Sequence, residues 1–548
     1  MMDRRRLITK AFPGIGLAAL ATQQGAMAQS GGRTPGPAWN VRDFRAQGDG
    51  KTLDTVALQA AIDACSQGGG VVFFPKGSFL SGTLTLKDGV TLHLSPGATL
   101  LGSQSISDYP PKPFPARDLD VGGFDIWALV YADGAKNIGI EGPGTINGNG
   151  KPFPPRTPVG NRDISTGARP RLLFLKGCQN VRITDVTLCD SGCWTAHFAL
   201  CDKVFVQGIC VYSSFFYNED GILLDSCQDS FVSGCFVDTS DDAIVVKASF
   251  PRVCKNIAIT NCVLTTTCAA IKFGTQSLGG FQNVSISNCA CYECPLGGLK
   301  FLTVDGGDLE DITVSNISMH NVSAPITIVL GNRGQDYGFK KVERPGSVAR
   351  LRNVVVSGIR ATVASRNDRW RTGNTCLIAG IPGHPVEGVM IDNVYMTYPG
   401  SGTLAEAQRR DVPEQEKAYP ENTMFGVLPA YGFYLRHAKG VALHNVRLEL
   451  EKPDLRPALI CDDVEDLELT GFKAPGNGDE PLIRLRNTRG AVIQNCRTLG
   501  SVESFLRVEG ATSADIALLA NDLRRVRNVA LKADGFIGDI AQAGNLLP

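Results

Sequence analysis

The stretch Cys254-Lys-Asn-Ile-Ala-Ile-Thr-Asn-Cys262 decides the fold of this chain, because close copies of it recur along the sequence. The next two copies are Phe281-Gln-Asn-Val-Ser-Ile-Ser-Asn-Cys289 and Leu309-Glu-Asp-Ile-Thr-Val-Ser-Asn-Ile317, each beginning 27 or 28 residues after the one before. Every copy alternates apolar with polar residues over a few positions and has Asn near its end. That pattern is typical of a short strand followed by a turn.

The repeat continues far beyond these three copies. Strong copies also begin at Cys178, Cys201 and Cys227, and fainter ones begin at Lys136, Leu351, Glu387, Lys439, Glu465, Arg489 and Arg527. A unit of 20–28 residues made of short strands cannot bury a core by itself, whereas stacked units share a continuous core. The sequence therefore predicts an all-β, single-stranded parallel β-helix over residues 38–530, with a C-terminal tail at 531–548.

A short helix is expected at the start of this solenoid. Residues 54–65 place apolar side chains at helical spacing among good helix formers, and three glycines at 68–70 follow. A solenoid must cover the exposed end of its core, so we expect this helix to cap it. A chain of 548 residues would ordinarily indicate several domains, but the repeat indicates one long stack.

Composition and cysteine spacing narrow the function classes. Lys plus Arg is 54 and Asp plus Glu is 54, and this neutral balance argues against a nucleic-acid partner, which would need a basic surface. Thirteen of the 17 cysteines fall between Cys178 and Cys294, where Cys alternates with large apolar residues at fixed repeat positions. We expect these to be buried core thiols, mostly unpaired. Metal binding and disulfides between coils are the alternatives; the spacing follows the coil period and no His accompanies it.

The N-terminal residues 1–28 read as an export signal. Arg4-Arg5-Arg6 forms a basic start, a mildly apolar stretch follows, and Ala26-Met27-Ala28 matches a cleavage site. The arginines resemble a twin-arginine signal; an ordinary secretory signal or a membrane anchor are the alternatives. No later segment has 18 uninterrupted apolar residues. We therefore expect an exported monomer, periplasmic or extracellular, that does not bind a membrane after signal removal.

Acidic residues recur at one position of neighbouring repeats. Asp220 ends the segment Asn218-Glu219-Asp220, and Asp241-Asp242 follows 21 and 22 residues later, which is close to one period. The three carboxylates should therefore meet on adjacent coils, where repulsion raises the pKa of at least one and sets an acid beside a base. Glycoside hydrolysis needs such a pair. Calcium binding and turn capping by Asp are the alternatives.

The same residues carry a family resemblance. Together with the opening Asp43-Phe-Arg-Ala-Gln-Gly-Asp-Gly50 and Gly142-Pro-Gly-Thr-Ile-Asn-Gly148, the two acidic motifs make the chain resemble glycoside hydrolase family 28, the polygalacturonase and rhamnogalacturonase family. The resemblance implies a right-handed β-helix and an inverting hydrolase that acts on pectic polysaccharide without a cofactor or metal. It also implies that Asp241 is the general acid, while Asp220 and Asp242 hold and activate water.

Two departures from the family pattern concern the sugar that is bound. Cys268-Ala269-Ala270 stands where the family has Gly-His-Gly, and Lys300-Phe301-Leu302 stands where it has the Arg-Ile-Lys that binds a substrate carboxylate. A rhamnose or another sugar is therefore an alternative to galacturonate at the cleavage position. The residues expected to contact substrate are Lys272, Lys300, Lys247, His197, Asn218 and Arg333; the alternatives are solvated surface cations and a buried structural His.

Four long insertions interrupt the repeat, at 103–130, 150–170, 334–348 and 399–430. Insertions of this kind usually lie on the binding face of a solenoid, so we expect them to wall the site and to favour exo-action. Within the hydrolase interpretation, a rhamnosidase or galacturonosidase directed at rhamnogalacturonan is one alternative. A lyase that uses calcium and a basic residue is another, and a non-catalytic carbohydrate-binding β-helix protein is the third.

Overall fold

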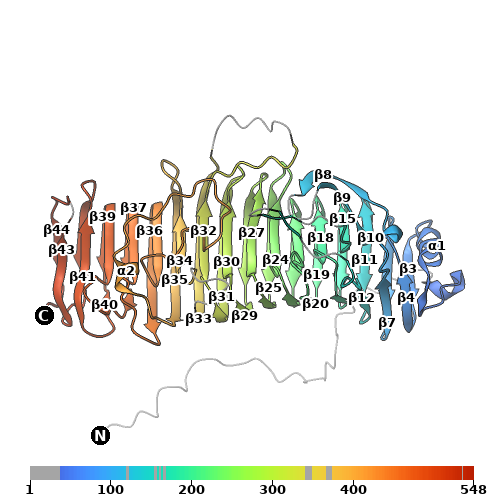
Figure 1. Ribbon diagram of the computed structural model, residues 1–548, viewed down its shortest axis with the longest axis horizontal. Coiled ribbons are helices and arrows are strands. Elements are labelled where there is room, and N and C mark those ends of the chain that lie inside the picture. The colour runs from blue at the N-terminus through green and yellow to red at the C-terminus, as the bar shows by residue number, and fades with distance from the viewer. Residues whose placement is uncertain are drawn as a thin grey trace, which may run out of the picture.

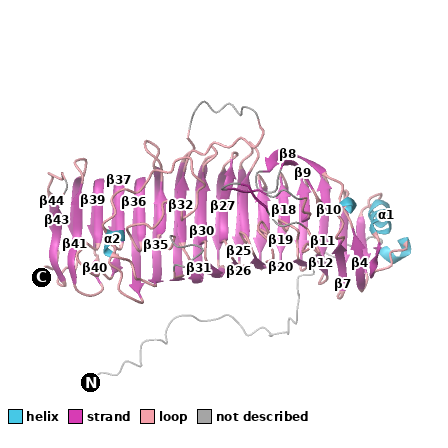
Figure 2. Cartoon of the chain, viewed as in Figure 1, coloured by secondary structure: helices cyan, strands magenta, loops and turns pink. Residues whose placement is uncertain are grey.

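The computed structural model describes residues 38–118, 123–153, 157–159, 162–164, 168–339, 348–365, 373–533 and 535–548. The export signal predicted at residues 1–28 lies outside these ranges. The described chain is a right-handed parallel β-helix, as predicted, and forms one elongated stack of strands (Figure 1). Helices are confined to a few short pieces, most of them at the N-terminal end (Figure 2).

After the first coil, each coil of the N-terminal half contributes one strand to each of three parallel sheets. The first sheet contains β1 (Ala38–Asn40), β3 (Gly70–Phe74), β6 (Val90–Leu94), β11 (Lys136–Glu141), β16 (Gln179–Thr184), β19 (Asp202–Gln207), β22 (Gln228–Ser233), β25 (Cys254–Thr260) and β28 (Phe281–Ser287). The second contains β2 (Asp49–Leu53), β4 (Gly77–Ser81), β7 (Ala98–Gly102), β12 (Thr145–Asn147), β17 (Thr187–Cys189), β20 (Cys210–Ser213), β23 (Phe236–Thr239), β26 (Val263–Thr266) and β29 (Ala290–Cys294).

The third sheet carries the residues of functional interest. It contains β5 (Leu84–Thr85), β10 (Ala128–Asp133), β15 (Arg171–Lys176), β18 (Ala196–Ala199), β21 (Ile222–Asp225), β24 (Ile244–Ala248), β27 (Ala269–Ser277), β30 (Gly297–Thr303), β32 (Ile326–Leu330) and β34 (Cys376–Ala379). Alternate side chains of each strand point into the core, and the others point outward from the solenoid.

Towards the C-terminus the strands of neighbouring sheets merge into longer ones. These are β31 (Leu309–Val322), β33 (Leu351–Val363), β35 (Val386–Tyr398), β36 (Phe433–Leu450), β37 (Leu459–Thr470) and β39 (Ile483–Gln494). The last coils contain β38 (Lys473–Ala474), β40 (Arg497–Thr498), β41 (Val502–Glu509), β42 (Ala514–Leu519), β43 (Val526–Lys532) and β44 (Ile540–Ala543). Because β44 pairs in parallel with β42, the sheet continues past residue 530, into the segment that the sequence analysis treated as a tail.

A helix covers the N-terminal end of the core. The helix α1 (Thr55–Cys65) buries Leu58, Ala61, Ile62 and Cys65, and it lies where the sequence predicted it, beside the 3-10 helix η1 (Val41–Phe44). The carboxylate of Asp54, just before α1, accepts hydrogen bonds from Gln47 N at 2.7 Å and Gly48 N at 2.9 Å. That contact ties the entry loop to the start of the helix.

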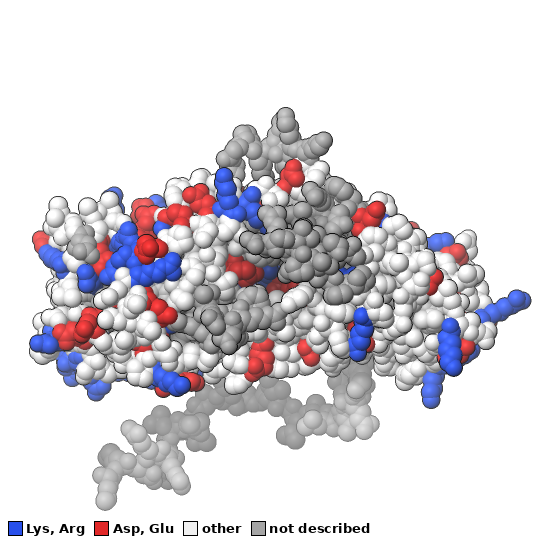
Figure 3. Space-filling view, in the orientation of Figure 1, with Lys and Arg blue, Asp and Glu red and all other residues white. Residues whose placement is uncertain are grey.

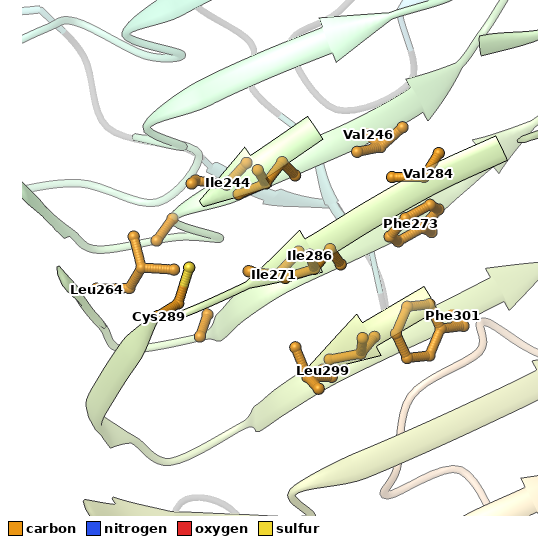
Figure 4. Packing of buried hydrophobic residues seen from close by; sticks show 14 of the residues in the cluster. Ile244, Val246, Leu264, Ile271, Phe273, Val284, Ile286, Cys289, Leu299 and Phe301 are labelled. Carbon is orange, nitrogen blue, oxygen red and sulfur yellow. The ribbon is translucent and has the colours of Figure 1, made fainter. Parts of the chain in front are cut away.

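Identical or similar side chains stack in the core from coil to coil. Ile244, Ile271 and Leu299 occupy paired positions on β24, β27 and β30 and lie in successive layers (Figure 4). All 17 cysteines are free thiols, and those at the repeat positions are buried, as the sequence indicated. At the turns, the Asn residues near the ends of successive repeats also stack, and Asn316 donates to Asn288 Oδ1 over 2.7 Å.

The insertions form structure outside the coils. The first contains the 3-10 helix η2 (Ile106–Asp108) and the hairpin of β8 (Lys112–Asp118) with β9 (Gly123–Ile126); the second contains β13 (Thr157–Val159) and β14 (Arg162–Ile164). Residues 399–430, here called the arm, begin with the short helix α2 (Leu404–Ala407). Among the described residues, no helix combines the length and apolar character needed to span a bilayer.

Candidate active site on the third sheet

The predicted acidic residues meet at the entry to the third sheet. Strands β21 and β24 pair with Ile222 opposite Ile244, so the residues two positions earlier, Asp220 and Asp242, lie on adjacent coils. The backbone confirms this register, because Gly221 N donates to Asp242 O over 3.0 Å. Asp220 and Asp242 are buried, with 3% and 4% of the residue exposed. Asp241 is half-buried beside them.

Asp242 is held by a cation and a backbone amide. Lys272 Nζ lies 2.9 Å from Asp242 Oδ2, and Ala269 N donates to Oδ1 over 3.1 Å. Burial alone would raise the pKa of this carboxyl, but Lys272 and Lys300 outweigh burial and hold it below its usual range. Asp242 is therefore the ionised member of the group.

Asp241 has the opposite electrostatic environment. Burial raises its pKa, and the neighbouring Asp242 charge raises it further. Its Oδ2 accepts from Asn218 N over 3.2 Å, and its Oδ1 accepts from Asp242 N over 2.9 Å. These contacts fix the carboxyl in place, while its raised pKa favours the protonated form that a general acid requires.

Asp220 competes with Asp241 for a proton. Burial raises the pKa of Asp220 well above its usual range, and the charge of Asp241 raises it further; Lys247 opposes both effects. Because the charge of Asp241 raises the pKa of Asp220, the two carboxyls favour a state in which one is protonated and the other ionised. With Asp242 ionised against Lys272, the site can offer one acid and two carboxylates.

Asp220 follows a turn that Arg169, a residue from outside the coil, stabilises. Asn218 has a positive φ of 63°, and its Oδ1 accepts from Arg169 Nη2 over 3.2 Å. Arg169 also donates to Tyr217 O over 2.8 Å. Glu219 is bound within the turn: its Oε2 accepts from Phe215 N over 2.6 Å, and burial raises its pKa to about 7. Asn218 and Glu219 thus shape the turn.

The arm brings a further acid onto the cations. Lys272 and Lys300 are paired residues of β27 and β30 and have 5% and 0% exposure. Glu421 Oε1 lies 3.4 Å from Lys272 Nζ, and its Oε2 contacts Lys300 Nζ. Tyr419 lies beside them, with its hydroxyl 3.5 Å from Lys272 Nζ.

Two further residues expected to contact substrate, Lys247 and Arg333, are held by other side chains of the third sheet and its loops. Lys247 is buried against Trp194, with Nζ 4.1 Å from the ring centroid, and its charge acts on Asp220. Arg333 makes two hydrogen bonds to Asp305, of 2.9 and 2.6 Å, and faces the Tyr419 ring at 5.7 Å.

His197 is enclosed and does not reach the surface in this structure. It has no exposed area, its Nδ1 lies 2.9 Å from Arg171 Nη1, and its Nε2 lies 3.4 Å from Asp225 Oδ2. Burial lowers its pKa to about 4, with help from the Arg171 charge. The ring is therefore neutral near pH 7.

Cys268 adds a thiol to the acidic group. One potential ligand atom from each of Asp241, Asp242 and Cys268 lies within 4.8 Å of the others. Calcium takes oxygen ligands rather than a thiol, and Lys272 already places a cation on Asp242. We therefore assign no metal to this group.

Two apolar clusters cover parts of the outer face of the third sheet. In one, the first and third insertions pack together through Phe114, Ala116, Ile126, Tyr131, Phe174, Phe250, Leu278 and Tyr337. On the C-terminal side, the arm packs on the sheet through Leu302, Val329, Leu377, Val412, Phe425, Leu428, Tyr434 and Ile460. Figure 3 shows that surface Lys and Arg side chains, with Asp and Glu side chains between them, gather towards the C-terminal end of the visible face.

Sequence reasoning missed Glu421, Tyr419 and Arg169. None belongs to the repeat: Arg169 comes from the second insertion, and the other two come from the arm. Lys272 and Glu421 are 149 residues apart in the chain, so no local spacing connects them. The length of the insertions was the feature of the sequence that indicated further residues near the site.

Comparison with known sequences gives the family. The sequence model described as Glycosyl hydrolases family 28 matches residues 71–415, and one described as Rhamnogalacturonase A/epimerase, pectate lyase-like matches residues 38–99. A Probable polygalacturonase of Vitis vinifera is 27% identical over 372 residues, which cover 64% of this chain and 72% of that protein. An Exo-poly-alpha-D-galacturonosidase of Dickeya chrysanthemi is 28% identical over 398 residues, with 61% and 65% covered.

Comparison with solved structures supports the same fold. The family 28 exopolygalacturonase of Yersinia enterocolitica superposes with a TM-score of 0.61 at 21% identity, covering 81% of this chain and 79% of that one. At this identity the likeness concerns the arrangement of the coils, and the chemistry must be argued from the residues present here.

Proposed function

Because the chain belongs to glycosyl hydrolase family 28, and is therefore a glycosidase, we propose that it cleaves pectic polysaccharide or oligosaccharide by an inverting acid/base mechanism. The observation that carries the proposal is the contrast among three adjacent carboxyls. Lys272 keeps Asp242 ionised, whereas burial and neighbouring charge raise the pKa values of Asp241 and Asp220.

Each carboxyl has a distinct role in this proposal. Asp241 donates its proton to the glycosidic oxygen as the bond to the anomeric carbon breaks. Asp220 and Asp242 hold a water molecule on the other side of the sugar, and the ionised form of Asp220 takes a proton from it as it attacks. Asp220 then releases the proton it gained to solvent, and Asp241 takes up a proton from solvent, which restores the starting state.

Several features support a pectic substrate. Lys247, Lys272 and Lys300 line the sheet next to the acids, and they can donate hydrogen bonds to sugar hydroxyls or carboxylates. Asn218 and Arg333 are the further substrate contacts we propose, with Arg333 acting through Tyr419; His197 has no exposed area and is instead a buried structural residue. The relatives named polygalacturonase and exo-poly-alpha-D-galacturonosidase support the same class of polymer.

The arm, which packs over the coils on the C-terminal side of the acids, favours exo-action, because a long polymer has little room to continue past it. The sequence features of residues 1–28 support export to the periplasm or beyond. A single chain builds every residue of the proposed site, which suits a monomer.

A rhamnogalacturonan-directed hydrolase, a rhamnosidase or galacturonosidase, is the second candidate. The match of residues 38–99 to the rhamnogalacturonase A/epimerase model favours it. So does the pairing of Lys300 with Glu421, because a lysine that already has a carboxylate partner is less available to galacturonate.

The test is a substrate screen with wild type and Asp241→Asn. Reducing-sugar release is measured on fragments of homogalacturonan and rhamnogalacturonan, and ultraviolet absorbance reports any unsaturated product. We expect sugar release by wild type, a loss of about a hundredfold to ten-thousandfold in Asp241→Asn, and no unsaturated product. Unsaturated sugars would instead indicate a lyase. Equal release by both proteins would remove Asp241 from the mechanism.

A further inference from the structure

Glu421 holds two of the buried cations beside the acids, Lys272 and Lys300. Its two carboxylate oxygens reach different lysines: Oε1 lies 3.4 Å from Lys272 Nζ and Oε2 contacts Lys300 Nζ. The Glu421 side chain is itself only 15% exposed. A carboxylate from the protein thus occupies the position in which a carboxylate from a sugar would meet these lysines.

The charges around Lys272 and Lys300 are already balanced. Lys272 is shared between Asp242, at 2.9 Å, and Glu421, and Lys300 has Glu421 as its contact. Two ammonium groups face two carboxylates, so the group has no net charge in excess for an incoming anion. An ionised uronate here would have to separate Glu421 from a buried lysine and would bring a third negative charge close to Asp242.

The segment that carries Glu421 is fixed to the solenoid. Asn422 is 1% exposed and donates from Nδ2 to Gly373 O over 2.6 Å. Arginines of the C-terminal coils donate to main-chain oxygens of the arm: Arg436 to Val412 O (2.7 Å), Arg456 to Leu428 O and Ala430 O (3.3 Å each), Arg484 to Ala407 O (2.7 Å) and Arg486 to Arg410 O (2.9 Å). Glu421 is therefore part of the built site, with no freedom to act as a loose surface acid.

The geometry points to Glu421 as a specificity-determining residue that selects a neutral sugar, and excludes an ionised uronate, at the position next to Lys272 and Lys300. This inference rests on the proposed function. The chemical class is a pyranose without a free carboxylate, whose hydroxyls can donate to Glu421 and accept from the lysines. Within pectic material, both methyl-esterified galacturonate and rhamnose belong to this class.

The test compares matched substrates on wild type, Glu421→Gln and Asp411→Asn. Asp411 lies on the same arm with its side chain 97% exposed, so its variant removes one negative charge away from the lysines. The substrates are a galacturonan oligosaccharide, the same oligosaccharide after methyl esterification, and a rhamnogalacturonan oligosaccharide. Activity on the second or the third distinguishes the two neutral sugars.

We expect wild type and Asp411→Asn to show at least tenfold higher kcat/KM on a neutral substrate than on the ionised galacturonan. In Glu421→Gln, where the lysines lose their carboxylate partner, this ratio should fall at least tenfold. Wild type that prefers the ionised substrate, or a ratio that Glu421→Gln leaves unchanged, would overturn the inference and leave the proposed function standing. Inactivity of wild type on all pectic substrates would instead refute the proposed function, and this inference with it.

A measurement on wild type alone covers the case in which Glu421→Gln does not fold. Free galacturonate and its methyl ester are compared as competitive inhibitors of whichever pectic substrate wild type cleaves. The inference predicts tighter inhibition by the ester. Tighter inhibition by ionised galacturonate would overturn it.

Discussion

Replacing Lys272 with Met is the perturbation that most directly tests the electrostatics of the site. The side chains of Lys272 and Asp242 are 6% and 5% exposed, and their charged atoms are 2.9 Å apart. Met keeps most of the aliphatic stem and removes the charge. Asp242 then loses its nearest cation, so burial raises its pKa and favours the protonated form at the expense of the carboxylate.

The magnitude follows from the distance. At 2.9 Å and an effective dielectric constant of about 20, the Coulomb attraction is about 6 kcal/mol. Lys300 remains nearby and Asp242 can take up a proton, so the net loss of stability near pH 7 should be smaller, about 3–5 kcal/mol as for other broken buried pairs. In wild type the depressed pKa of Asp242 stabilises the fold above the ordinary Asp pKa, and this contribution is lost as pH falls through the lower, folded-state pKa.

Urea unfolding of wild type and Lys272→Met at pH 7 and pH 4 measures the effect. We expect a large difference between the two proteins at pH 7 and a smaller one at pH 4, where Asp242 in the variant is protonated more easily. The acidic limb of the kcat/KM profile should also move to higher pH in the variant. Lys272→Arg is the charge-retaining control and should move the limb less. An equal loss of stability at both pH values would refute the electrostatic reasoning and leave only lost packing.

Three further predictions concern the acids, the core and the arm. Asp241→Asn should strongly reduce activity yet raise the free energy of unfolding at pH 7 by about 0.5–2 kcal/mol, because it removes a half-buried carboxyl whose charge is disfavoured; lower stability in thermal unfolding would contradict this. Phe273→Ala should cost about 3–5 kcal/mol, because its ring is fully buried, whereas Val263→Ala, at a position 38% exposed, should change the urea midpoint little. Arg456→Ala should leave the buried Asp454 without its 2.8 Å partner and remove the hydrogen bonds to Leu428 O and Ala430 O of the arm. The arm should then become sensitive to limited proteolysis; cleavage at the wild-type rate would show that Arg456 does not hold it in place.

The repeat carried most of the information about the fold. Because the coil period nearly equals the spacing of Asp220 and Asp242, the sequence was sufficient to bring these acids together on adjacent coils. The same periodicity identified the cysteines as core residues, since a fixed repeat position faces the same side in every coil.

The repeat could not predict the surroundings of residues that contact the insertions. His197 lies on the outward face of β18, yet Phe114 from the β8–β9 hairpin packs against its ring at 6.0 Å and helps to enclose it. Glu421 reaches Lys300 only because the arm folds back over the sheet. The arm has no period, so its sequence does not specify which of its side chains arrives at which coil.

The central claim is that Asp241 and its neighbouring carboxylates hydrolyse a glycosidic bond with inversion. Time-resolved proton NMR of the first product formed by wild type tests it most directly, because it distinguishes the two anomers of the new reducing end before they interconvert. The product should appear first as the anomer whose configuration is opposite to that of the bond that was cleaved. Initial release of the same anomer, or of an unsaturated sugar, would contradict it.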